Sequence, residues 1–356
     1  MNFKKIIVWI VMVFIFTSCN EEEIIAVKNS DAIDGNNKFA LKMFNQISQK
    51  SDKNIFISPY SISTALAMTY AGAKNDTKEE MRKTLNLHSN DNITHSSFQY
   101  LIKSINKFDK SNKDIVLKTA NAIWVDNSFT IKKSYQELIV KKYYSSINGL
   151  DFKNKPTNSE KIINKWASKN TEGKIKEILP KGTISKQTRL VLTNAIYFLA
   201  DWKNKFKKRY TKEKKFYLLD KEVSKVKMMH QSEKFNYFEN EKMQIIEMSY
   251  KNERMSMLVF LPKENSRSAI NSLLDFESFN TNLEKLQKQK VQLYLPKFQF
   301  DYFSSLKNVL QEMGMKQAFT MQADFTGINK NKRETLMISD VLHKAYIDVT
   351  EKGTEA

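Results

Sequence analysis

Side chains that could carry out acid–base or metal chemistry are few and scattered along this sequence. The four histidines are His88, His95, His230 and His343, and none has HExxH spacing or a cluster of acidic residues beside it. The sequence also contains no Gly-x-Ser-x-Gly, Gly-x-Gly-x-x-Gly or P-loop motif. We therefore predict no catalytic residues, no metal site and no cofactor.

One short motif does match an enzyme signature. Ser104-Ile105-Asn106-Lys107 has the SxxK spacing of acyl-enzyme hydrolases. The SDN and KTG motifs that accompany SxxK in those enzymes are absent, and chance matches are expected in a chain rich in Ser and Lys. The sequence therefore predicts a protein that is not an enzyme.

The charge of the chain is strongly positive. Lys and Arg outnumber Asp and Glu by 58 to 39, and the excess is spread along the chain. The simplest interpretation is a basic, solvated surface. Residues 202–210, WKNKFKKRY, interleave basic and aromatic side chains, and either contact a polyanion weakly or protect a strand edge by charge. We expect no specific nucleic-acid partner.

The first residues have the pattern of an export signal. Lys4 and Lys5 precede an apolar run over residues 6–16, which is short for a membrane span and typical of a signal peptide. Small residues then lead to Cys19, the only cysteine, as in the lipidation signal of bacterial lipoproteins. We predict a lipoprotein signal peptide at 1–18, a tether at 19–33, and a protein held outside the cell or at its surface by lipidated Cys19. An ordinary signal peptide with an incidental cysteine is the alternative.

The rest of the chain, residues 34–356, is predicted to be one domain of the α+β class. Ser58 and Pro59 are placed to begin a buried helix, and Thr77-Lys78-Glu79-Glu80 has the spacing of a capping box. Later segments are long, apolar and strand-like without βαβ regularity. The predicted strands include residues 115–125, 189–202, 255–262, 291–300 and 341–351.

These segments together resemble the serpin family, whose motifs appear in the same order and at similar spacing. The resemblance covers nearly the whole chain from about residue 34. The motifs are NIFISPYSISTALAM, ANAIWV, INKWASKNTEGKIKEILP, LTNAIYFLADW, VKMMHQ, LPKF, MGMKQAF, ADFTGI and ISDVLHKAYIDVTEKGTEA.

The resemblance implies a serpin fold with three β-sheets and eight or nine helices, and a metastable, monomeric native state. It also implies an exposed reactive loop that baits a serine or cysteine protease and then inserts into the central sheet. Serpin loop insertion is itself an established example of strand addition and of stored strain released by a switch.

The same resemblance assigns roles to particular residues. The hinge of the reactive loop would be Gly353, Thr354, Glu355 and Ala356, with Thr354 and Ala356 facing the core and Glu355 facing solvent. Residues that hold the sheet closed, called the shutter, would be Ser58, Ser61, Asn194 and His343. The point where the loop enters, called the breach, would contain Trp202, Lys297 and Glu351.

The reactive bond is expected beyond Ala356 and is therefore absent from this chain, as are the last strands of two sheets. The intact protein is predicted to be a protease inhibitor, and its target protease cannot be identified without the reactive-site residue. Two alternatives remain: a serpin that acts as a carrier or chaperone without inhibiting, and the product of a decaying gene that does not fold.

Overall fold

The structure of the protein is a computed structural model. It describes residues 9–11 and 23–356, except for residues 52, 112–114, 219–220, 252, 254, 267, 270–274 and 331–334. Cys19 and most of the predicted signal peptide lie outside the described residues. No helix in the described ranges has both the length and the apolar character required to cross a membrane.

A six-stranded central sheet runs along the molecule in the order β10-β11-β12-β4-β2-β3. Its neighbouring strands are antiparallel, except that β2 and β3 are parallel. The strands are β2 (Ile115–Asp126), β3 (Ser146–Leu150), β4 (Leu190–Asp201), β10 (Phe298–Ser305), β11 (Leu342–Val349) and β12 (Gly353–Glu355).

The remaining strands form two further sheets that share one long strand, β6. The first part of β6 pairs with β5, and its last residues pair with β7, while β9 lies along its other edge. The strand β8 pairs with β7, and residues 9–11 pair with β8 as β1. The bounds are β1 (Trp9–Val11), β5 (Lys212–Leu218), β6 (Lys221–Glu239), β7 (Met243–Ser249), β8 (Ser256–Pro262) and β9 (Gln287–Pro296).

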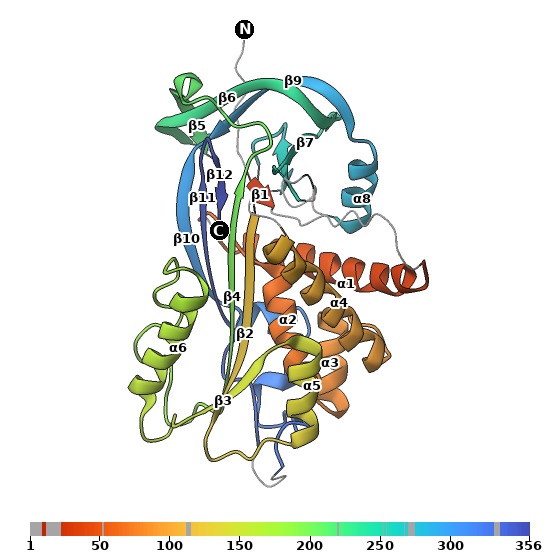
Figure 1. Cartoon of the computed structure of the whole chain (residues 1–356), viewed down its shortest axis with the longest axis vertical. Helices are drawn as coiled ribbons and strands as arrows, with labels where there is room; N and C mark the ends of the chain where they lie inside the picture. The colour runs from red at the N-terminus through yellow and green to blue at the C-terminus, as the bar shows by residue number, and fades with distance from the viewer. Residues whose placement is uncertain are drawn as a thin grey trace.

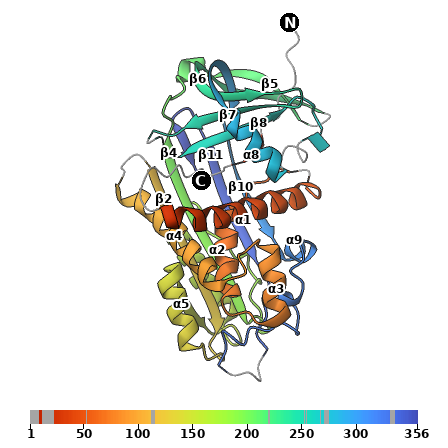
Figure 2. The ribbon, with the colours of Figure 1, turned by 90° about the vertical axis from the view of Figure 1, so that its right-hand side faces the viewer.

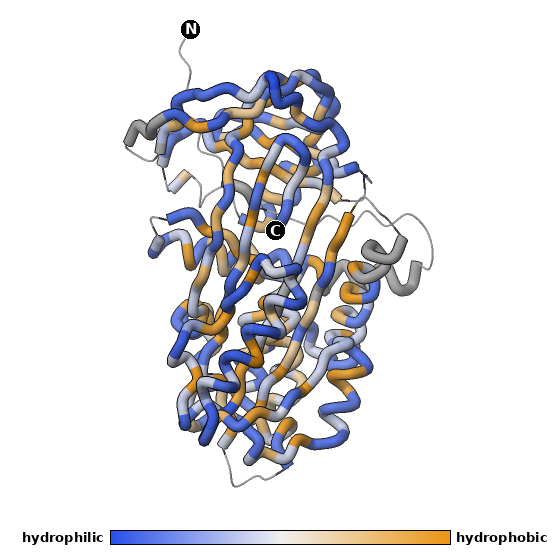
Figure 3. Tube along the Cα trace, turned by 60° about the vertical axis from the view of Figure 1, so that its left-hand side comes forward, coloured by the Kyte–Doolittle hydropathy of each residue, from blue (hydrophilic) through white to orange (hydrophobic). Residues whose placement is uncertain are grey.

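The helices cover both faces of the central sheet (Figures 1 and 2). The helix α6 lies alone on one face, and α1, α2 and α4 lie on the other. Figure 3 shows the apolar colour along the middle of the sheet and a mostly hydrophilic upper rim. The helices are α1 (Glu23–Ser48), α2 (Pro59–Tyr70), α3 (Asn75–Thr84), α4 (Asp91–Ser111), α5 (Lys133–Tyr143), α6 (Pro156–Asn170), α8 (Phe276–Glu284) and α9 (Lys307–Glu312), with 3₁₀ turns η1 (Lys208–Tyr210) and η2 (Gln317–Phe319).

The predicted α+β class and the three-sheet architecture are confirmed, but some local predictions differ from the structure. The helix α1 begins at Glu23, so much of the predicted tether is helical, and Ile33 packs against the main core. The helix α2 has Pro59 in its first turn and Ser58 at its N-cap position, as predicted. The Ser58 hydroxyl, however, donates to the Ser61 hydroxyl and makes no capping hydrogen bond to the backbone.

The predicted capping box at residues 77–80 is also wrong in detail, because long-range contacts take its side chains. The helix α3 begins at Asn75, and the Thr77 hydroxyl accepts a hydrogen bond from the Asp324 backbone N–H at 2.9 Å. The Glu80 carboxylate accepts the backbone N–H groups of Lys316 and Gln317 at 2.8 and 2.6 Å.

The predicted strand at 291–300 is divided between two sheets. The strand β9 ends at Pro296, β10 begins at Phe298, and Lys297 is the junction between them. The backbone N–H of Lys297 still bonds to the Lys227 carbonyl at 2.8 Å, so the chain turns into the central sheet directly from β9. This junction brings the Lys297 side chain to the top of the central sheet.

Candidate functional site

The C-terminal residues of the chain form a strand within the central sheet. After β11 the chain turns back at Thr350–Lys352, and β12 then lies between β11 and β4. Two hydrogen bonds between Ala356 and Phe198, at 2.6 and 2.7 Å, extend this pairing to the last residue. The predicted hinge is therefore in an inserted position in this structure.

Gly353 lies where the two backbones approach most closely. A Cβ atom at this position would be 2.0 Å from the Ala200 carbonyl oxygen. Because this neighbour is backbone within a paired strand, it cannot move away as a flexible side chain could. Gly353 is thus needed for close approach at the point where β12 enters the sheet.

The side chains of β12 alternate between the core and the outer face. Thr354 is 1% exposed and Ala356 is 9% exposed, while Glu355 lies on the opposite face. The Glu355 carboxylate accepts a hydrogen bond from Tyr197 at 2.9 Å and is 2.8 Å from Lys174. The small side chains therefore enter the core, and the charged one finds polar partners outside.

Lys297 and Glu351 lie together at the top of the sheet, where the chain turns from β11 into β12. The Lys297 ammonium is 3.1 Å from the buried Glu351 carboxylate, whose other oxygen accepts the Thr211 hydroxyl at 2.9 Å. Burial tends to raise the pKa of Glu351, but hydrogen bonds from its own backbone N–H, Lys297 and Thr211 outweigh burial and lower it. Glu351 is therefore held as an anion.

Trp202 packs beside this ion pair and is 1% exposed. Its indole N–H donates to the Thr350 carbonyl at 2.9 Å, and its backbone N–H donates to the Lys352 carbonyl at 2.9 Å. Its ring stacks on Tyr250 at a centroid distance of 4.7 Å. The Tyr250 hydroxyl in turn donates to the Thr354 hydroxyl at 2.9 Å, so Trp202 and Tyr250 fix both ends of the turn into β12.

Three of the four predicted shutter residues meet lower in the sheet. The Ser58 backbone N–H donates to His343 Nε2 at 3.2 Å, and the Ser58 hydroxyl donates to the Ser61 hydroxyl at 2.8 Å. His343 is 4% exposed, and burial lowers its pKa to about 4. His343 is therefore neutral at pH 7 and can accept the Ser58 hydrogen bond.

Asn194, the fourth residue, is in β4, where it pairs in register with Asn121 of β2. Two residues before Asn194, Leu192 forms an isolated parallel bridge with Val341, which is two residues before His343. Asn194 and His343 are thus each two residues beyond this bridge, on the parallel strands β4 and β11. The strands β4 and β11 are bridged at Leu192 and separated further up, where β12 lies between them.

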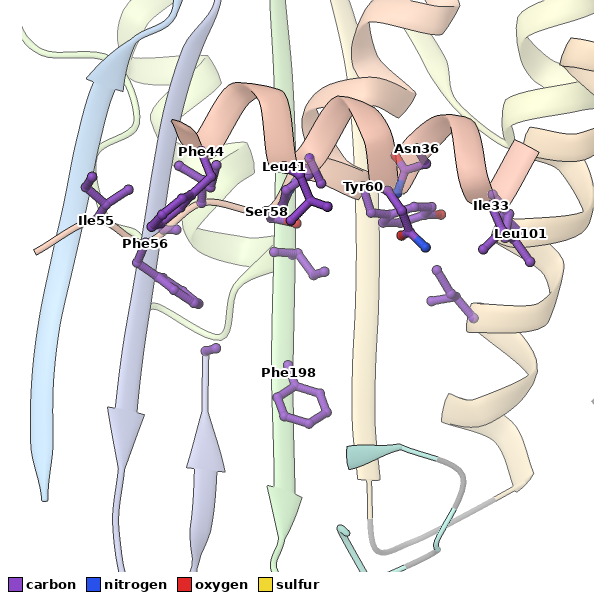
Figure 4. A pocket seen from close by; sticks show the side chains of 18 of the residues that line it. Ile33, Asn36, Leu41, Phe44, Ile55, Phe56, Ser58, Tyr60, Leu101 and Phe198 are labelled. Atoms are coloured by element: carbon purple, nitrogen blue, oxygen red, sulfur yellow. The ribbon is translucent and has the colours of Figure 1, made fainter. Parts of the chain in front are cut away.

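An apolar cavity of about 110 Å³ occupies the space between the bridge and the end of β12. Its lining comes from β4 and β11, which are separated here, and from the helices beneath the sheet (Figure 4). We call this separation of β4 and β11 the gap. The lining residues include Phe56, Tyr60, Ile196, Phe198, Ala345 and Ala356. Ala356 reaches the upper wall of the cavity, so a strand that continued past Ala356 would run directly into it.

Comparison with known proteins assigns the chain to a family. Residues 34–356 match the family described as serpin (serine protease inhibitor). The chain belongs to the serpin family. An uncharacterised serpin-like protein of Thermococcus kodakarensis is 38% identical over 320 residues, which cover 90% of this chain and 73% of that protein. Human serpin B4 is 36% identical, with coverage of 91% and 87%.

The fold agrees with this assignment. The solved structure of cleaved serpin 42Da matches with a TM-score of 0.85 and 30% identity, covering 92% of this chain and 88% of that one. The serpin resemblance read from the sequence is thus confirmed. The family is one of protease inhibitors rather than enzymes.

Sequence reasoning did not identify several residues of this serpin that support the hinge. Thr211, Tyr250, Tyr197 and Lys174 contact Glu351, Thr354 or Glu355, although they come from distant parts of the chain. No local pattern marks them, since each lies in an ordinary strand, turn or loop. Tyr250 is the one exception: it carries a hydroxyl directly after the apolar strand β7, and a polar group in that place could have indicated a buried hydrogen-bond partner.

The ion pair at the top of the sheet should stabilise the inserted hinge. Replacing Glu351 with Gln removes its charge, and we expect the free energy of unfolding to fall by about 1–2 kcal/mol. Glu351→Lys places two ammonium groups together, so it should be more severe and should increase soluble oligomers after mild heating, measured by size-exclusion chromatography. The charge-swapped Lys297→Glu/Glu351→Lys variant should recover part of the loss. Equal oligomer levels in native and Glu351→Lys protein would contradict this.

The buried, neutral His343 predicts a pH dependence of stability. Its folded pKa of about 4 lies below the value near 6.5 expected in the unfolded chain, so the unfolded chain binds the proton first as pH falls. Its contribution is complete above pH 6.5 and is lost towards pH 4. In urea titrations, the stability of native protein relative to His343→Gln should fall by about 1.4 kcal/mol per pH unit in this window. Parallel pH profiles for the two proteins would be inconsistent with this account.

Proposed function

We propose that the intact protein inhibits a serine or cysteine protease by inserting its cleaved reactive loop into the central sheet. The observation that carries this proposal is the position of β12, whose residues pair with both β4 and β11. The similarity to a cleaved serpin structure supports the same proposal.

The inserted residues are suited to this mechanism. Gly353 permits close backbone approach, and Thr354 and Ala356 place small side chains in the core. The cavity below Ala356 supplies apolar space for the residues that would follow. A protease attached to the cleaved end would be carried along the sheet as those residues enter it, because each added residue gains strand hydrogen bonds and burial.

A second function is suggested by the same cavity. A concave apolar space is the usual form of a small-molecule site, and this one has a mostly apolar lining. In a serpin that carries an apolar ligand, the hinge would serve to open and close this space. The two functions differ in whether a protease is trapped.

The inhibition test compares residues 20–356 with the product of the complete reading frame of the gene. Each is incubated with trypsin-like, chymotrypsin-like, elastase-like and papain-like proteases and examined for covalent complexes by denaturing electrophoresis. We expect a complex with the complete product. A variant of the complete product from which all residues after Ala356 are deleted serves as the negative control, because trapping needs a scissile bond within a continuous loop.

Two hinge variants of the complete product sharpen this test. Thr354→Arg puts a large cation at a core-facing position, so the protease should cleave the loop and escape. Glu355→Arg places the same side chain on the outer face, one residue away, and should retain most of the complex. The carrier function would be favoured if every protease digests the complete product without forming a complex. It would also be favoured if the two variants have equal effects.

We also propose that the protein is anchored to a bacterial membrane through Cys19 and acts outside the cell or at its surface. The support is the basic and apolar leader followed by Thr17-Ser18-Cys19. Several acyl chains on one residue would hold a soluble domain firmly at a bilayer. Cys19→Ala should move the protein from the membrane to the soluble fraction, whereas Ser18→Ala, as a matched control, should not. Membrane retention of Cys19→Ala would contradict lipidation there.

A further inference from the structure

Two carboxylates face each other on the outer side of the central sheet, the face that carries α6 (Figure 1). Asp348 of β11 lies directly opposite Glu355 of β12 in the antiparallel register. Side chains in such positions have Cβ atoms about 4.5–5.5 Å apart, and like charges there are destabilising. The insertion of β12 therefore places a negative charge beside one that is already in the sheet.

The two carboxylates differ in their partners. One Glu355 oxygen accepts the Tyr197 hydroxyl at 2.9 Å, and the other is 2.8 Å from the Lys174 ammonium. The Asp348 carboxylate has no hydrogen bond or ion pair to any residue that the structure describes. Burial and then the Glu355 charge raise the pKa of Asp348. Asp348 therefore meets the Glu355 charge without a partner of its own.

The other polar groups beside Asp348 do not supply that partner. The strand β10 places the neutral Gln299 in register with Asp348 on its other side. The Lys297 ammonium favours the Asp348 anion from a distance, but it is bound to Glu351 at 3.1 Å. Tyr346 lies two residues before Asp348 on the same face, and burial and the Asp348 charge raise its pKa, so it is uncharged.

The segment that follows α6 holds Lys174 over this pair. Gly173, just before it, has a φ of +78°, and its backbone N–H bonds back to the last turn of α6 at 2.8 Å. Ile175, just after it, is 2% exposed and packs in the core beneath α6. The Lys174 ammonium also lies 5.2 Å from the centre of the Tyr346 ring. The backbone on both sides of Lys174 is thus fixed, and its side chain reaches β11 as well as β12.

The remaining acid in this region already has a cation. The charge of Glu172 reaches Tyr197, but the Glu172 carboxylate is 2.7 Å from the Lys118 ammonium of β2. Burial and the hydrogen bond to Glu355 raise the pKa of Tyr197 to about 12, so its hydroxyl stays protonated and donates. Among the described residues, Lys174 forms the only ion pair with either carboxylate of the Asp348–Glu355 pair.

We propose that Lys174 is a positioning residue for β12, and that its ammonium offsets the repulsion between Asp348 and Glu355 when the hinge enters the sheet. A proton on Asp348 has the same effect at acidic pH, because a protonated carboxyl is neutral and can donate a hydrogen bond to its neighbour. Hinge insertion therefore needs Lys174 at neutral pH and needs it less as the pH falls. The importance of Lys174 for trapping a protease rests on the proposed function.

The direction of the pH effect follows from proton linkage. When β12 leaves the sheet, Glu355 moves away, and Asp348 loses a neighbour that raises its pKa. Asp348 therefore binds a proton more readily with β12 inserted than with β12 withdrawn, so a lower pH favours the inserted form. The Lys174 charge lowers the pKa of Asp348. Its removal should therefore make the pH dependence stronger.

The test measures amide exchange at Ala356 and Phe198, whose backbone groups bond to each other at the end of β12. Protection is expressed relative to the unfolded chain at the same pH. Lys174→Gln should lower the protection of both amides by about fivefold or more at pH 7.5. At pH 4.5 the loss should be less than about twofold. Comparison with native protein at each pH cancels the effect of His343, which both proteins share.

Three further variants separate this role from a general effect of charge. Lys174→Arg should keep about half of the native protection or more, since a guanidinium can bind the same carboxylate. Lys176→Gln removes the same charge from the same segment, and Lys176 forms no ion pair with the residues described, so protection should change less than about twofold. Lys174→Gln/Asp348→Asn removes the repulsion and should restore protection at pH 7.5 to within about twofold of native.

Equal protection in native protein and Lys174→Gln at pH 7.5 would overturn the proposal. A loss that is the same at both pH values, and that Asp348→Asn does not restore, would also overturn it, because Lys174 would then have only a structural role. These exchange measurements need no protease. If the complete product traps no protease, the proposed function fails, whereas the role of Lys174 is decided by exchange alone.

Discussion

The close pairing of β12 between β4 and β11 is the constraint on which the rest of this site depends. Each of the neighbouring strands would otherwise present unpaired backbone groups in the upper part of the sheet, and unpaired buried groups are strongly disfavoured. The strand fits because Gly353 has no Cβ to meet the Ala200 carbonyl. Thr354 and Ala356 then fill the core positions below it.

Three features lie at successive levels of the gap between β4 and β11. At the top, Glu351 joins Lys297 and Thr211 and fixes the turn. In the middle, an apolar cavity separates the end of β12 from the bridged part of the sheet. At the bottom, His343 accepts from Ser58 close to the point where Leu192 and Val341 bring β4 and β11 together. Opening the gap further would have to break this lower contact.

Much of this arrangement could be predicted from the sequence, because it follows from family motifs and from the alternation of apolar and polar residues along strands. The alternation from Val341 to Val349 predicts a strand, and the structure has β11 there. Pro59 predicts the start of α2 correctly. These features depend on local periodicity and backbone geometry, which a short stretch of sequence records directly.

Other features could not be predicted, because they depend on contacts between distant segments. Thr77 and Glu80 have the spacing of a helix cap, yet they bond to residues 316, 317 and 324. Tyr250 and Thr211 support the hinge from separate strands and turns, and nothing beside them in the sequence indicates this. Lys234 and Lys290 likewise lie opposite each other only because β9 aligns with β6.

Amide hydrogen exchange tests most directly whether residues 353–356 occupy the central sheet. In the native protein, the amides of Ala356 and Phe198, which bond to each other's carbonyls, should exchange slowly. In Gly353→Ala, where the new methyl group meets the Ala200 carbonyl, both should exchange much faster, while the amides of β2 should be unchanged. Rapid exchange at Ala356 and Phe198 in the native protein, at the same rate as in the variant, would contradict the account.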